Sequence, residues 1–162
     1  MFAGEFTCKL DDKGRFAMPA SLRDYFSLPG RTEVKKAVLV KSQQEICLWL
    51  FPLPNWHELL DVQRQRLTER ESRLFMHYTV SDVIEAEIDR ASRVLIPRKL
   101  REHAKIGEEA LLVGMYDRLE IWGSEPWLAH LNELEEEHEM SLGKVLHMPS
   151  IKPAMPGVEP QP

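Results

Sequence analysis

The chain contains the same module twice, and this repeat restricts its possible folds more than any other feature of the sequence. The segment Asp11–Arg23 returns 78 positions later as Asp89–Arg101, with aspartate, arginine, proline, leucine and arginine at the same spacing. The apolar positions and the later tryptophans also match in kind: Phe6 with Ile84, Cys8 with Ala86, Leu10 with Ile88, Phe16 with Val94, Met18 with Ile96, Trp49 with Trp122 and Trp56 with Trp127. Two copies are too few for a solenoid. The repeat therefore predicts one globular unit with an internal pseudo-two-fold axis.

The composition is that of an ordinary globular protein. The chain has 162 residues, of which 43% are hydrophobic and 29% charged, which suits one or two domains with a substantial core. No apolar run approaches the roughly 18–20 residues of a membrane span, and the first residues lack the features of a signal peptide. Cys8 and Cys47 fall at apolar strand positions without metal-ligand spacing, so we expect two reduced core thiols in the cytosol.

Charge is distributed unevenly along the chain. The net charge of −5 argues weakly against a nucleic-acid partner. However, basic residues outnumber acidic ones between Lys9 and Lys41, whereas Glu120–Glu139 contains acidic residues and no lysine or arginine. This asymmetry predicts a positive field at one end of an otherwise acidic molecule.

Each copy predicts the same order of short elements. Alternating apolar residues indicate a strand at residues 6–10 or 84–88, followed by a turn and a second strand at 15–18 or 93–96. Pro19 or Pro97 then ends the strand and suits the first turn of a helix. Two further strands complete each copy, at residues 38–40 and 46–50 and at residues 111–113 and 119–122.

Longer helical patterns follow the two copies. Residues 55–77 predict one helix, with Asn55 and Glu58 in a capping arrangement at its start. The domain organisation expected from these patterns is a first module at residues 5–52, a linking helix at 53–80, a second module at 82–125, a C-terminal helix at 126–148 and a proline-rich, disordered tail at 149–162. The fold class is mainly β with short helices, of the α+β type.

The pattern Asp-x-x-x-Arg falls at the turn of both copies and is the candidate site. Residues four apart across a tight turn face each other, so Asp11 is expected to pair with Arg15, and Asp89 with Arg93. Such a pair can simply close a hairpin, where it contributes little to stability. In the first copy the turn also carries Lys13 and Gly14, and a cationic turn that permits close approach suits a DNA groove. An arginine steadied by a carboxylate presents its remaining donors in a fixed fork for guanine edges or phosphates.

These residues resemble those of the bacterial MraZ family. The resemblance rests on the opening Met1-Phe2-x-Gly4-Glu5-Phe6, on the turn Asp11–Arg15 followed by Pro19, and on the repeat at Asp89–Pro97. It covers about residues 1–135 and implies two SpoVT-AbrB-type swapped-hairpin modules folded together as a small barrel, plus two longer helices. It also implies a cytoplasmic, nucleoid-associated transcriptional regulator that binds double-stranded DNA at repeated boxes upstream of its own division and cell-wall operon. The implied assembly is a head-to-tail ring on the order of eight subunits.

Carried over residue by residue, the resemblance assigns DNA contact to Asp11, Lys13, Gly14 and Arg15, with Asp89, Arg90 and Arg93 as a supporting second copy. The chain departs from the family pattern at Ala3, where a basic residue is usual. Its second turn also lacks a glycine. We therefore expect the first turn to dominate DNA recognition and the second to serve mainly assembly.

Other classes of function find less support in the sequence. The histidines show no metal-ligand spacing and no nucleotide-binding or nucleophile motif is present, so we expect no cofactor, no metal and no enzyme. One alternative is a ring-shaped protein-interaction scaffold whose DNA contact is incidental. A second is an AbrB-type antitoxin, against which the doubled module argues.

Overall fold

The protein, as a computed structural model, is described at residues 1–28 and 31–145, and the expected tail at 149–162 lies outside this part. The strands are β1 Glu5–Lys9, β2 Arg15–Ala17, β3 Ser27–Leu28, β4 Arg31–Lys41, β5 Cys47–Pro52, β6 Ile84–Ile88, β7 Arg93–Leu95, β8 Glu109–Gly114 and β9 Leu119–Trp122. The helices are the 3-10 helices η1 Ala20–Phe26 and η2 Val80–Asp82, and the α-helices α1 Leu53–Arg66, α2 Glu69–Tyr78, α3 Arg98–His103 and α4 Ser124–Val145.

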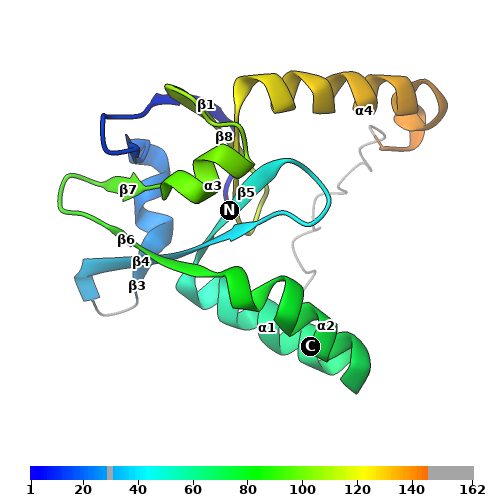
Figure 1. Ribbon diagram of the computed structural model, residues 1–162, viewed down its shortest axis with the longest axis horizontal. Helices are drawn as coiled ribbons and strands as arrows, with labels where there is room; N and C mark the ends of the chain where they lie inside the picture. Colours follow the sequence, from blue (N-terminus) through cyan, green and yellow to red (C-terminus); the bar gives the residue numbers. More distant parts are fainter. Residues whose placement is uncertain (29–30, 146–162) are drawn as a thin grey trace, which may run out of the picture. The chain divides into compact units, whose positions relative to one another are not determined.

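The strands form one antiparallel sheet that curls almost into a barrel. Their order is β1-β8-β9-β5-β4-β6-β7-β2, with β3 paired to β4 outside this path. The two ends of the path meet through an isolated bridge between Leu10 and Phe16. The expected fold class, mainly β with short helices in a small barrel, is confirmed (Figure 1).

The two copies are interlocked through their strands. The pairs β1–β8, β2–β7, β4–β6 and β5–β9 each join a strand of one copy to a strand of the other. The strand registers are equivalent in the two copies. Phe6 pairs with Leu112, and its counterpart Ile84 pairs with Leu39. Phe16 faces its own counterpart Val94, so the pseudo-two-fold axis passes through this pair.

This strand exchange modifies the hairpins that the sequence predicts. Apart from the Leu10–Phe16 bridge, β1 pairs with β8 rather than with β2, and β6 meets β7 only at the pair Ile88–Val94. Both β2 and β7 are three residues long, and every residue of one strand pairs with a residue of the other. The turn between the first two strands of each copy is therefore local, whereas the strands themselves are stabilised by the other copy.

The hydrophobic core lies inside this barrel. The alternation of β2 and β7 directs Phe16 and Val94 inward, where both are fully buried together with Met18 and Ile96. Cys47 is also buried, and burial raises the pKa of its thiol. A second cluster lies on the other side of the sheet, where Val38, Val40, Phe51 and Trp56 are buried and join β4 and β5 to α1.

The expected single helix at residues 55–77 is two helices, α1 and α2 (Figure 1). Leu67 adopts an extended conformation and Thr68 caps α2 in a complete capping box with Glu71. The expected cap at Asn55 was wrong, because Asn55 lies within α1 and its Nδ2 donates to the carbonyl of Asp117 at 2.8 Å. The sequence signal for the break was the Thr68-x-x-Glu71 pattern, which the apolar periodicity across it obscured.

Helix α4 begins on a cluster of rings. Trp122 at the end of β9 packs against Trp127 and stacks on His130, with centroid distances of 5.3 and 4.7 Å. Within the described part of the chain, no helix is long and apolar enough to cross a membrane.

The Phe16–Val94 pair gives a test of the interlocked core. Phe16→Ala should lower the free energy of unfolding by about 3–5 kcal/mol, because it leaves a cavity where both copies meet. Chemical denaturation followed by circular dichroism measures this change. Leu128→Ala is the control, since that side chain is 61% exposed, and an equally small effect of both changes would contradict the assignment of the core.

Candidate nucleic-acid interface

The first turn is held by a network centred on Asp11. Its Oδ2 accepts a hydrogen bond from Arg15 Nε at 2.7 Å, so the expected ion pair is present. Its Oδ1 accepts from the backbone N–H groups of Lys13 and Arg15 at 3.0 and 2.9 Å. The backbone closes the turn, because Asp11 N donates to Arg15 O at 2.8 Å and Gly14 N donates to Asp11 O at 3.0 Å. One carboxylate thus fixes both the shape of the turn and the direction of the arginine.

The second turn repeats this network. Asp89 Oδ2 accepts from Arg93 Nε and Oδ1 accepts from Arg93 N, both at 2.8 Å. Ser92 stands where the first turn has Gly14, and both residues have a positive φ, 59° and 83°. The missing glycine therefore does not change the form of the turn. Ser92 adopts there a left-handed backbone conformation that favours glycine.

Both arginines lie on one exposed face. In the antiparallel pair β2–β7, Arg15 faces Leu95 and Ala17 faces Arg93, while the inward residues between them are buried. Arg15 and Arg93 are thus diagonal neighbours, a relation that places such residues roughly 7–8 Å apart. This two-stranded ribbon carries a turn at each end, with Lys13 exposed at one tip and Arg90 at the other. The predicted residues of both turns lie along this ribbon with their tips at opposite ends, and Gly14, expected to be open to a ligand, is buried.

The electrostatics of the two turns are alike. Hydrogen bonds from the backbone N–H of Arg15, together with its guanidinium, hold the pKa of Asp11 below its usual value. The same contacts from Arg93 lower the pKa of Asp89. Both aspartates are therefore charged at neutral pH and orient their arginines. Each pair leaves the Nη1 and Nη2 atoms of its arginine outside the contact, where they can donate to a ligand.

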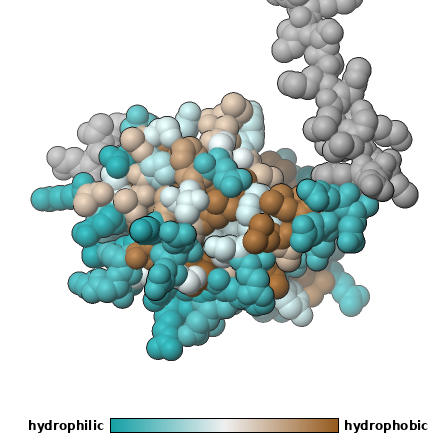
Figure 2. Space-filling view, turned by 90° about the horizontal axis from the view of Figure 1, so that it is seen from above, coloured by the Kyte–Doolittle hydropathy of each residue, from teal (hydrophilic) through white to brown (hydrophobic). Residues whose placement is uncertain are grey.

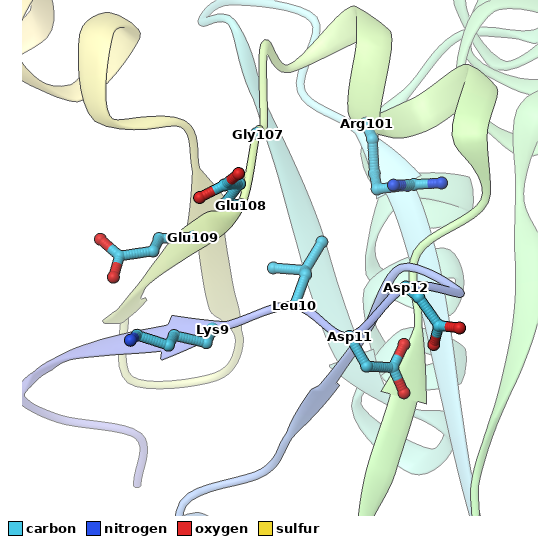
Figure 3. Close-up of a pocket in the computed structure, with 8 residues that line it drawn as sticks. All are labelled: Lys9, Leu10, Asp11, Asp12, Arg101, Gly107, Glu108 and Glu109. Atoms are coloured by element: carbon cyan, nitrogen blue, oxygen red, sulfur yellow. The ribbon is translucent and has the colours of Figure 1, made fainter.

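A cavity of about 430 Å³ lies beside the first turn. It is lined by Lys9, Leu10, Asp11, Asp12, Arg101, Gly107, Glu108 and Glu109 (Figure 3). Sequence reasoning did not select Arg101, which reaches this place from α3. Among the residues that the structure describes, no three histidine, cysteine or acidic side chains are grouped to hold a metal ion.

The fold and the site define a class of protein: an interlocked two-copy barrel that presents two aspartate-steadied arginines on one ribbon. The family model described as "MraZ protein, putative antitoxin-like" matches residues 1–77 and 81–144. The chain belongs to the MraZ family.

Similar proteins share nearly the whole length of the chain. Three of them, each named "Transcriptional regulator MraZ", come from Moorella thermoacetica, Pediococcus pentosaceus and Salinispora tropica and are 32%, 32% and 34% identical to it. The matches cover 90%, 86% and 85% of this chain and 97%, 92% and 92% of those proteins. These relatives are named as regulators rather than enzymes, which agrees with the expectation that the chain is not an enzyme.

The network around Asp11 predicts how that carboxyl group titrates. In Arg15→Ala its pKa should rise but remain below the usual aspartate value, because the largest cause is the backbone N–H of residue 15, which the variant keeps. Since the pKa is lowered in the folded protein, the stability that the pair contributes is present above the ordinary value, about 3.9, and is lost as the pH falls through the lowered one. A pH titration of the carboxyl carbon by NMR measures this. A full return to the usual value would show that the guanidinium alone causes the shift.

Proposed function

We propose that this protein is a sequence-specific, double-stranded DNA-binding regulator of transcription. The observation that supports it best is the exposed β2–β7 ribbon, on which Asp11 and Asp89 hold Arg15 and Arg93 in the same orientation. The names of its relatives support the regulatory role. Following the family resemblance, the proposed target is a set of repeated boxes upstream of its own division and cell-wall operon, and the proposed location is the nucleoid in the cytoplasm.

A ribbon of this kind suits the major groove. Two-stranded ribbons fit the width of that groove, and an arginine with two terminal donors can contact guanine O6 and N7 together. Because Nε of Arg15 is bound to Asp11, the plane of the guanidinium is fixed before DNA arrives. Lys13 at the exposed tip supplies a charge for a neighbouring phosphate.

The two turns are proposed to contribute unequally. Lys13 adds charge at the exposed tip of the first turn, so we propose this turn as the main reader; Gly14 itself is buried beneath the Arg101 side chain. Asp89, Arg90 and Arg93 form the supporting site. Because the structure places Arg93 on the same face as Arg15, a supporting DNA contact by Arg93 fits the geometry better than a role in assembly alone.

Several copies of the ribbon are needed for tight binding. One ribbon reaches few bases, whereas a homo-oligomer that presents several ribbons raises the effective concentration at repeated DNA boxes. A ring on the order of eight subunits is the proposed form of this assembly.

The protein has apolar surface available for such self-association. A groove between α1 and α2 is lined by His57, Leu60, Asp61, Arg64, Ser72, Phe75 and Met76. No residue of α2 is buried, and Leu74 and Met76 are 50% and 46% exposed. Apolar side chains also reach the surface in patches on the face drawn in Figure 2. Exposed apolar surface of this kind marks contacts with other chains.

The alternative, a scaffold whose DNA contact is incidental, draws on the same apolar groove and on the acidic residues Glu133, Glu135 and Glu136 of α4, which are exposed. A carboxylate pair by itself could serve to close each turn, but the scaffold alternative does not account for the placement of both arginines on the same outer face of the ribbon. DNA binding accounts for that arrangement, so it is the preferred function.

The proposed function is tested by removing one arginine at a time. Arg15→Ala should abolish preference for DNA from upstream of the operon over scrambled DNA, because a bidentate base contact is worth roughly 1–3 kcal/mol per copy. Arg93→Ala, its matched control from the second turn, should retain most of that preference. Gel-shift titrations at several salt concentrations measure both, with light scattering to check particle mass. Unchanged preference in Arg15→Ala would disprove the site, and equal losses in both variants would show that the turns are equal readers.

The assembly is tested separately at the α1–α2 groove. Met76→Glu should reduce the particle mass seen by light scattering, because it places a charge in the apolar groove. Met115→Glu is the control, since Met115 is similarly exposed, at 42%, but lies outside the groove. The mass should not respond to reducing agent, because the described cysteines are free thiols. A wild type that is monomeric would refute the ring while leaving the DNA site open.

A further inference from the structure

A guanidinium from the second copy lies directly against the first turn. The ideal Cβ position on Gly14 falls only 2.6 Å from Cζ and 2.7 Å from Nε of Arg101. Glycine at this position leaves the space beside its Cα that the Arg101 side chain occupies. Since Ser92 adopts a positive φ in the otherwise equivalent turn, the contact with Arg101 is the feature that distinguishes the first turn.

Arg101 has no protein partner for its charge within the described residues. Its Nε is buried without a hydrogen bond, although Arg101 as a whole is half-buried rather than enclosed. Four acidic side chains line the same cavity, namely Asp11, Asp12, Glu108 and Glu109, and within the described residues none of them forms an ion pair with Arg101. Both oxygens of Asp11 are bound to the turn, and Glu108 and Glu109 point to the opposite side of the cavity (Figure 3). A partly buried cation without a partner is costly unless a ligand completes it.

The pseudo-symmetric counterpart of Arg101 is placed differently. Arg23 occupies the same position in the first copy, and its Nε donates to the carbonyl of Met18 at 2.9 Å. The N–H of Met18 donates in turn to the carbonyl of Ser92 at 2.8 Å, so Arg23 is bonded beside the second turn. The two copies therefore differ in the bonding of this cation, because Nε of Arg23 has a partner and Nε of Arg101 has none, although their Asp-x-x-x-Arg networks are the same.

We propose that Arg101 binds a DNA phosphate beside the bases contacted by the first turn. This inference rests on the proposed function and explains the inequality of the two turns by a residue outside both of them. Arg15 reads bases, whereas Arg101, fixed on α3 and against Gly14, anchors the backbone of the same DNA segment. The ligand is a phosphodiester within duplex DNA, so its contribution is independent of sequence and sensitive to salt.

The test compares three single variants of the full chain. Arg101→Gln removes the charge but keeps a long side chain against Gly14. Arg101→Lys keeps the charge without the fork. Arg98→Ala removes a charge from the same helix, where the Arg98 side chain is 85% exposed and paired with Glu102. Affinities for upstream and scrambled DNA are measured by fluorescence anisotropy over a salt series, with thermal unfolding as a check on the fold.

We expect Arg101→Gln to weaken binding to both DNAs by the same factor and to lower the slope of log affinity against log salt by about 0.9 per engaged subunit. Arg101→Lys and Arg98→Ala should keep the wild-type slope. An unchanged slope in Arg101→Gln would overturn the proposal, and so would an equal reduction in Arg98→Ala. Loss of sequence preference in Arg101→Gln would assign Arg101 to positioning the turn instead. If the wild-type protein shows no preference for upstream DNA over scrambled DNA, the proposed sequence-specific function is disproved. That outcome is distinct from an unchanged salt slope in Arg101→Gln, which disproves only the role of Arg101.

Discussion

The pairing of β2 with β7 is the interaction on which the rest of this structure depends. It sets Phe16 against its counterpart Val94, so the centre of the core forms only when both copies are present. The outward residues of the same short strands are the two arginines, held by Asp11 and Asp89. The candidate DNA-binding site therefore forms only when the barrel folds, because the inner face of the ribbon packs in the core and its outer face carries the two arginines.

The backbones of the two turns are nearly identical, whereas the side chains around them differ. The two turns share hydrogen bonds, ion pairs and positive φ angles. They differ in what surrounds them, because Arg101 packs on Gly14 whereas Arg23 bonds to the carbonyl of Met18. The two copies of the module can therefore differ in how they contact a ligand while they keep the same fold, because the surface residues differ and the strand registers between the copies do not.

Several local features could be predicted from the sequence because they depend on residues close together in the chain. The Asp11–Arg15 and Asp89–Arg93 pairs followed from their spacing around a turn, and the mainly β fold followed from alternating apolar residues. The break between α1 and α2 was also a local signal, in Thr68 and Glu71, but the apolar period that runs across it favoured one helix. The cap assigned to Asn55 failed because that side chain bonds to Asp117, far along the chain.

The sequence by itself determined that the chain contains two equivalent modules, each with a carboxylate that orients an arginine. Only the tertiary structure decided how those modules combine: β1 with β8 and β4 with β6, rather than each module closing on itself. It also decided that Arg15 and Arg93 share a face, and that Arg101 meets Gly14. The physical reason is that strand partners and contacts between distant residues are selected by burying the core of both copies together, a free energy that no single segment contains.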